Sequence, residues 1–212
     1  MDRKIIVGVL GTQNTGKTTF INDVVEASKQ NGIKWNIFGK DYRKLIEEKG
    51  LKINRNGTEE SQQIIHNVLV QNIVDAVNST NDGGLIMDRT PIDSYVYTSY
   101  LKYNGGVSIN QNTIDKMWYQ CQKFCRLYDY LIYIPLSKCD NVKVVDDKFR
   151  DTNLEYRKKI DETMGSVYNY MREVYATDKV HFIEIYGSRE ERVDRFFRET
   201  ITFQIGQTST NN

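Results

Sequence analysis

The sequence predicts an α/β protein with three layers (α/β/α) built around a five-stranded parallel sheet. Short, β-branched apolar runs alternate along the chain with helical patterns, which is typical of βαβ units. The first run, Ile5-Ile6-Val7-Gly8-Val9-Leu10, is followed by a glycine-containing loop and then by apolar residues at helical spacing. With 212 residues the chain is long enough to cover both faces of such a sheet within one domain.

The predicted elements follow one another without an internal repeat or an interdomain linker. Strands are expected at 5–10, 35–38, 85–87, 130–134 and 180–185, and helices at 19–29, 42–49, 58–77, 90–103, 111–127, 152–175 and from 188 onward. Capping signals mark four of the helix starts, at Thr58, Thr90-Pro91-Ile92-Asp93, Thr152-x-x-Glu155 and Ser188-x-x-Glu191. We expect residues 1–203 to form a single domain and the polar segment 204–212 to be disordered.

The composition narrows the classes of function. Lys+Arg 29 against Asp+Glu 28 leaves a formal charge of +1, which argues against a protein whose main task is to grip a nucleic acid. No apolar run approaches the roughly 18 residues of a membrane span, and no signal peptide is visible. Cys121, Cys125 and Cys139 lack metal-ligand spacing, so we expect a reduced, cytoplasmic protein without structural zinc.

Residues 11–18 read Gly-Thr-Gln-Asn-Thr-Gly-Lys-Thr and fit the phosphate-binding pattern G-x-x-x-x-G-K-[ST]. The glycines let the backbone N–H groups turn toward an anion, and the helix that follows adds its dipole. The lysine would reach the β- and γ-phosphates, and the threonine hydroxyl would bind Mg²⁺. A chance glycine-rich turn is the competing interpretation, and the flanking strand and helix count against it. The residues expected to bind ATP are Gly11, Asn14, Thr15, Gly16, Lys17, Thr18 and Thr19.

Asp88-Arg89-Thr90 stands at the carboxyl end of the third predicted strand, the edge of the sheet at which ligands bind in such folds. Asp88 could join Thr18 in holding Mg²⁺. Arg89 suits a phosphate oxygen or a substrate carboxylate. The alternative is that Asp88 only caps the next helix together with Thr90.

Together, these motifs and the segment Asp147-Lys148-Phe149-Arg150, followed by Arg157, resemble the nucleoside and nucleotide kinases. The chain is similar to thymidylate kinase and the deoxynucleoside kinases, and most similar to the ATPase-like family that contains the ribosylnicotinamide kinase domain of NadR. The resemblance spans roughly residues 4–200 in element order, and only the phosphate loop is sharply diagnostic. It implies the strand order 2-3-1-4-5 and a small lid at about 138–152. Arg150 of that lid, with Lys148 or with Arg157 of the following helix, would neutralise charge on the transferred phosphoryl group.

The acceptor site of this superfamily follows the second strand, where this chain has Lys40-Asp41-Tyr42-Arg43. The relatives usually carry Glu three residues before Arg, whereas this chain has Lys40 there and the acid at Asp41. Asp41 could act as a general base on a hydroxyl acceptor. Arg43 with Arg89 would instead bind a phosphate acceptor. Gln62, in the long helix, stands where related kinases use a glutamine to pair with a base.

The sequence therefore predicts a phosphotransferase that uses ATP and Mg²⁺ and passes the γ-phosphoryl group to a small nucleoside or nucleoside monophosphate. A polynucleotide 5′-end kinase and a regulatory nucleotide-binding module without an acceptor are the alternatives. Ser137-Lys138-Cys139-Asp140 resembles the guanine-reading motif of GTPases, but its first position and the absence of a switch glycine after Asp88 argue against that class. The helices beside the third and fourth strands could supply a homodimer face.

Overall fold

The computed structural model describes residues 4–30, 34–81, 83–139, 151–176 and 179–208. In these residues, five strands form one parallel sheet in the order β2-β3-β1-β4-β5, which confirms the predicted fold class and strand order. The strands are β1 (Ile5–Leu10), β2 (Trp35–Ile37), β3 (Gly84–Asp88), β4 (Tyr130–Tyr133) and β5 (His181–Glu184). The helices are α1 (Lys17–Gln30), α2 (Tyr42–Glu48), α3 (Glu59–Asn78), α4 (Pro91–Tyr103), α5 (Gln111–Cys125), α6 (Leu154–Tyr175) and α7 (Arg189–Thr208), with short 3₁₀ turns η1 (Asn54–Asn56) and η2 (Leu136–Lys138).

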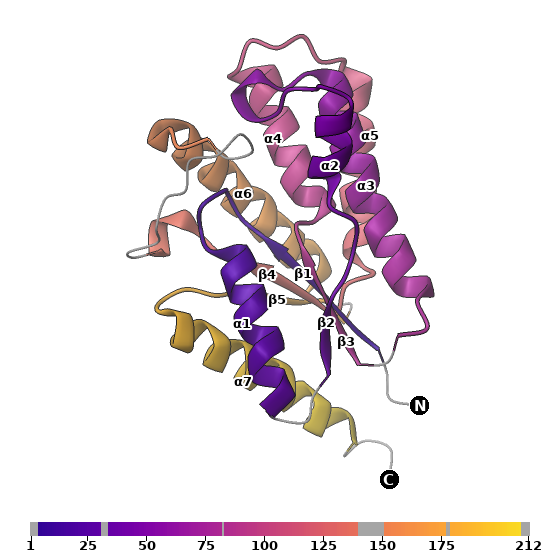
Figure 1. Cartoon of the computed structure of the whole chain (residues 1–212), viewed down its shortest axis with the longest axis vertical. Helices are drawn as coiled ribbons and strands as arrows, with labels where there is room; N and C mark the ends of the chain where they lie inside the picture. The colour runs from indigo at the N-terminus through magenta and orange to yellow at the C-terminus, as the bar shows by residue number, and fades with distance from the viewer. Residues whose placement is uncertain (1–3, 31–33, 82, 140–150, 177–178, 209–212) are drawn as a thin grey trace.

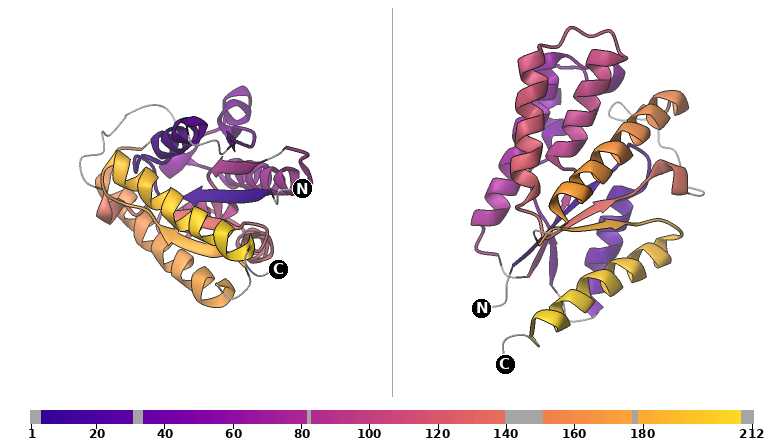
Figure 2. Two further views of the ribbon diagram at one scale, coloured as in Figure 1. Left: turned by 90° about the horizontal axis from the view of Figure 1, so that it is seen from below. Right: turned by 180° about the vertical axis from the view of Figure 1, so that it is seen from behind.

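The helices form a layer on each face of the sheet. Helices α1 and α7 lie side by side on one face, and α3, α4, α5 and α6 cover the other (Figures 1 and 2). Because strand side chains alternate between faces, β1 contributes Val7 and Val9 to the first core, and Ile6 and Leu10 to the second. Both faces of the sheet are therefore buried, which explains why its strands read as continuous apolar runs.

Helix starts were predicted well where the capping signal was unambiguous. Asp93 accepts from the backbone N–H of Thr90, at 2.9 Å, and Glu191 accepts from that of Ser188, at 2.7 Å. The expected cap at Thr152 is wrong by one residue, because Asn153 caps α6 by accepting from the N–H of Tyr156 at 2.8 Å.

Helix α7 continues to Thr208 and so includes the first part of the polar C-terminal segment 204–212. Residues 209–212 lie outside the described residues. Among the residues that the structure covers, no helix is both long and apolar enough to cross a membrane.

The register of the sheet determines where the site lies. Strand β3 pairs with β1 so that Asp88 is opposite Val9, two residues before Gly11. The loop after β1 and the Asp88-Arg89-Thr90 segment after β3 therefore leave the same edge of the sheet as neighbours. Gly8 permits this close approach, because a Cβ there would lie 2.7 Å from the side chains of Thr90 and Tyr128.

Candidate active site

The phosphate loop, residues 11–18, joins β1 to α1 and adopts a backbone that few residue types accept. Gly11 has φ +146°, Gly16 has φ +85°, and Asn14 has φ +55°. A side chain at Gly11 would also bring a Cβ to 2.7 Å from the carbonyl oxygen of Ile134. The glycines that the sequence motif demands are thus needed for the curvature of the loop.

Lys17, the first residue of α1, is buried with 5% of its surface exposed. Its ammonium group donates to the carbonyl oxygen of Thr12, at 2.6 Å, across the concave side of the loop. Burial, reinforced by the positive charge of Arg89, lowers the pKa of Lys17 to about 7. A bound polyphosphate would place a negatively charged partner beside this buried ammonium group.

Thr18 and Asp88 come together at the start of α1, as expected for a magnesium site. The Thr18 hydroxyl donates to Asp88 Oδ2 at 2.6 Å. The other carboxylate oxygen, Oδ1, is buried and has no hydrogen-bond partner in the described part of the chain. A hydroxyl and a carboxylate oxygen are ligands suited to Mg²⁺, which completes its shell with waters and phosphate oxygens. The residues present therefore fit the ion.

Arg89 links the phosphate loop to the start of α4. One guanidinium nitrogen, Nη1, donates at 3.1 Å both to the carbonyl oxygen of Gly11 and to Asp93 Oδ1. The backbone of Arg89 has φ +91°, a left-handed conformation that is strained for a residue with a side chain. The contacts of Arg89 with the phosphate loop and with α4 hold this strained conformation.

Asp93 is the centre of this network and is only 2% exposed. Besides Arg89, it accepts from the N–H of Gly11 at 3.3 Å and from the N–H and hydroxyl of Thr90 at 2.9 and 3.0 Å. The residue that the sequence marked as a helix-capping acid therefore also fixes the first residue of the phosphate loop.

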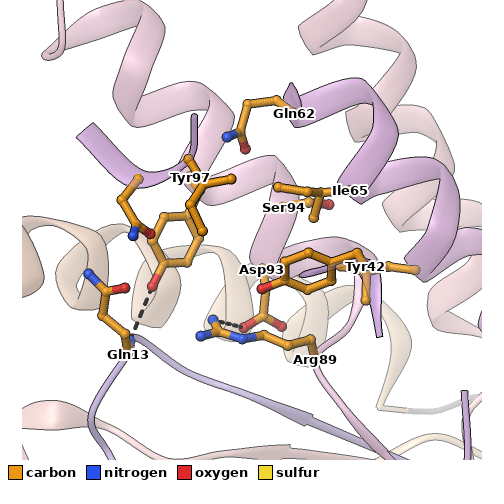
Figure 3. A pocket seen from close by; sticks show the side chains of 11 residues that line it. Gln13, Tyr42, Gln62, Ile65, Arg89, Asp93, Ser94 and Tyr97 are labelled. Atoms are coloured by element: carbon orange, nitrogen blue, oxygen red, sulfur yellow. Dashed lines mark hydrogen bonds and ion pairs between the residues drawn. The ribbon is translucent and has the colours of Figure 1, made fainter. Parts of the chain in front are cut away.

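A cleft of about 410 Å³, part of it open to solvent, adjoins the phosphate loop. Figure 3 shows Gln62 at one end of it, Arg89 and Gln13 at the other, and the rings of Tyr42 and Tyr97 between them. The Tyr97 hydroxyl accepts from the N–H of Gln13 at 3.1 Å, so the wall of the cleft contacts the phosphate loop directly.

The structure brings some of the expected acceptor residues to this cleft. Gln62 and Arg89 line it, whereas Asp41 and Arg43 are not among its lining residues. Asp41 instead caps α2 by accepting from the N–H of Arg43 at 2.9 Å, and its carboxylate pairs with the Arg43 guanidinium at 3.3 Å. Gln62 Oε1 accepts from the Thr98 hydroxyl at 3.3 Å.

Of the three residues expected at or next to the lid, the structure describes one, Arg157. Arg150 and Lys148 lie outside the described residues. Arg157 is buried in the first turn of α6 and donates to the carbonyl oxygens of Gln13, at 3.2 Å, and Asn14, at 3.1 Å. It therefore contacts the backbone of the phosphate loop.

Sequence reasoning did not assign several residues that line the cleft. One of them, Tyr42, lies inside the expected acceptor segment, between Asp41 and Arg43. The others come from segments that the motifs do not cover, namely Ile53, Asn54, Ile65, Leu69, Ser94 and Tyr97. The one usable signal was the cluster of tyrosines in α4, from which Tyr97 points toward the loop. Residues of η1 carried no recognisable pattern.

Comparison with known proteins agrees with this geometry. Residues 6–192 match the family described as AAA domain. The chain belongs to this AAA-domain family of phosphate-loop NTPases. A search among curated proteins found no match.

Solved structures share the fold of this AAA-domain protein at low sequence identity. NadR in complex with NAD and AMP-PNP aligns with a TM-score of 0.60 and 17% identity, over 92% of this chain and 49% of NadR. NadR in complex with NR gives 0.61 and 18%, over 92% and 51%. Deoxyadenosine kinase from M. mycoides with dCMP and dCDP gives 0.59 and 15%, over 93% of this chain and 100% of the kinase. The chain thus spans about half of the NadR chain and the whole of the kinase.

Proposed function

We propose that this protein is a kinase that transfers the γ-phosphoryl group of ATP to a small nucleoside or nucleoside monophosphate in the cleft. The observation that carries the proposal is the direct contact between the cleft and the phosphate loop. Gln13 belongs to both, and Arg89 lines the cleft while donating to the Gly11 carbonyl oxygen at 3.1 Å. A module that only binds or hydrolyses nucleotide has no need of a second cleft lined by polar side chains at that point. The likeness in fold to deoxyadenosine kinase and NadR supports the same conclusion.

The proposed chemistry depends mainly on position and charge. An acceptor oxygen forms a bond to the γ-phosphorus as the bond to the bridging oxygen of ADP breaks. Lys17 and Arg89 stabilise the charge of the transferred group, and Thr18 and Asp88 would hold a Mg²⁺ ion that would neutralise charge on the phosphates. We assign the same role to Arg150, from the lid expected at 138–152. Asp41 is the candidate base for a hydroxyl acceptor, and to act as one it must exchange its contact with Arg43 for the substrate.

The charge of the cleft favours a nucleoside over a nucleoside monophosphate. Arg89 and Asp93 are its charged lining residues, and they pair with each other at 3.1 Å. Arg43, the second arginine expected to bind an acceptor phosphate, is paired with Asp41. An acceptor phosphate would require uncompensated positive charge, and among the lining residues the charges balance.

An ATP-consumption screen tests this function. The purified protein is incubated with MgATP and each of the common nucleosides, nicotinamide riboside, each nucleoside monophosphate and a DNA oligonucleotide with a 5′-hydroxyl, and the products are identified by mass spectrometry. We expect acceptor-dependent release of ADP with a nucleoside, and its loss in Lys17→Ala. ADP release that no acceptor increases would support the regulatory module instead, and a phosphorylated oligonucleotide would support the end kinase.

A further inference from the structure

Two buried arginines from different helices contact the outer side of the phosphate loop. Arg157 comes from α6 and Arg192 from α7, with 4% and 5% of their surfaces exposed. Arg192 Nη1 donates to the carbonyl oxygen of Thr15 at 2.8 Å. With the contacts of Arg157 to Gln13 and Asn14, the two guanidinium groups bind three consecutive carbonyl oxygens of the loop.

Because peptide units are planar, these contacts also orient the backbone N–H groups on the other side of the loop. In a planar trans peptide, the C=O of one residue and the N–H of the next point in opposite directions. A carbonyl held outward at Gln13, Asn14 or Thr15 therefore turns the following N–H, of Asn14, Thr15 or Gly16, away from the arginines. Such successive inward N–H groups make up the anion cradle of a phosphate loop.

Each of the three guanidinium nitrogens of Arg192 has a partner among the described residues. Its Nε donates to the carbonyl oxygen of Gly187 at 2.9 Å, and its Nη2 lies 3.3 Å from Cys139 Sγ. The capping box of α7, formed by Ser188 and Glu191, fixes the turn that presents it. The side chain thus joins three segments, the phosphate loop, the end of η2 and the start of α7.

We infer that Arg192 is a positioning residue that, together with Arg157, holds the phosphate-loop amides in the orientation that binds polyphosphate. Neither arginine needs to touch the nucleotide for this role. Their charges also lie close to the phosphate site, where positive charge favours a polyanion. The inference depends on phosphate binding at the loop and not on phosphoryl transfer to an acceptor.

The test compares Arg192→Ala and Arg192→Lys with a control in the same helix. Arg189→Ala removes an exposed arginine that pairs with Asp23 at 2.6 Å and, within the described part of the chain, makes no hydrogen bond to the loop. Isothermal titration calorimetry measures the Kd of MgATP and of pyrophosphate for each variant, and thermal melting shows that each is folded at the temperature used. Pyrophosphate is included because it contains no base or sugar.

We expect Arg192→Ala to raise the Kd of both ligands about tenfold, by loosening one or two of the cradle amides. Arg192→Lys should weaken both less, because an ammonium group can still reach one carbonyl. Arg189→Ala should leave both Kd values within about twofold. Unchanged affinity in a folded Arg192 variant overturns the inference, as does weaker MgATP binding with unchanged pyrophosphate binding, which would assign Arg192 to the base of the nucleotide.

The same measurements keep this inference separate from the proposed function. A wild-type chain that binds both ligands but never transfers phosphate would refute the kinase and leave the role of Arg192 intact. A wild-type chain that binds neither MgATP nor pyrophosphate overturns the role of Arg192 directly. If Arg192→Ala fails to fold, the lysine variant carries the comparison.

Discussion

Replacing Asp93 by alanine is expected to destabilise the protein as a whole, although the residue stands beside the proposed site. The carboxylate accepts four hydrogen bonds, from Arg89, from the N–H of Gly11, and from the N–H and hydroxyl of Thr90. The substitution therefore leaves the charge of Arg89 without its partner in a mostly buried position, and it also removes the cap of α4.

The size of the effect follows from the cost of these two losses. Removing one partner of a buried ion pair typically costs about 3–5 kcal/mol. Loss of a helix cap costs about 1 kcal/mol. Because the same carboxylate serves both, and Arg89 keeps 11% side-chain exposure with which to recruit water, we expect a total of about 4 kcal/mol. That is a large part of the 5–15 kcal/mol that stabilises an average domain.

Urea unfolding followed by circular dichroism measures this loss. With a slope of about 2 kcal/mol per molar, the midpoint of Asp93→Ala should fall by roughly 2 M. Asp93→Asn should fall less, because the amide oxygen can still accept from Thr90. Asp115→Ala is the matched control, since Asp115 is an exposed acid that accepts a hydrogen bond from the side chain of Gln111, and its midpoint should hardly move. A midpoint for Asp93→Ala within about 0.5 M of the wild type would refute the reasoning.

Two further predictions concern the phosphate loop. Asp88→Asn should raise the Kd of ATP at least about tenfold in the presence of Mg²⁺ and much less in EDTA, because the lost carboxylate acts through the metal. Calorimetry measures both Kd values. Equal weakening in both buffers would contradict the magnesium assignment. Lys17→Met should abolish ATP binding yet raise the free energy of unfolding by up to about 5 kcal/mol at pH 7, because the folded protein buries the ammonium group and lowers its pKa from 10.5 to about 7. The unfolded chain binds this proton up to about pH 10.5, so the destabilisation by Lys17 is complete below pH 7 and disappears toward pH 10.5. The advantage of Lys17→Met should therefore shrink between pH 7 and pH 10 in urea midpoints, and an advantage that grew with pH would contradict the sign.

The fold and the nucleotide side of the site were readable from the sequence because they depend on local patterns. The strands are apolar because both faces of the sheet are buried, and the phosphate loop requires glycine at Gly11 and Gly16 for its backbone. Thr18 and Asp88 could be paired because parallel strands end at one edge. The start of α6 was misplaced because Thr152 and Asn153 are adjacent and both residue types can cap a helix.

Contacts between distant segments could not be read in the same way. Asp93 reaches the loop across 82 residues of sequence, and Arg192 reaches it across 177. The local patterns identified Asp93 as a helix-capping acid and did not single out Arg192, because both residues would read the same on an exposed helix. Only the packing of α4 and α7 against the loop gives these side chains their second role.

The contrast between local patterns and distant contacts also explains why the sequence predicts the phosphate-binding part of the site better than the proposed acceptor-binding part. A phosphate is bound largely by backbone N–H groups, so the backbone conformation of the loop determines that part of the site. The proposed acceptor would instead be bound by side chains that line the cleft, from α2, η1, α3 and α4. If the protein is a kinase, exchanging Gln62, Asn54 or Ser94 should therefore alter which acceptor is phosphorylated while leaving the Kd of MgATP unchanged. On the proposed function, the choice of acceptor depends on these three side chains more than on the phosphate loop.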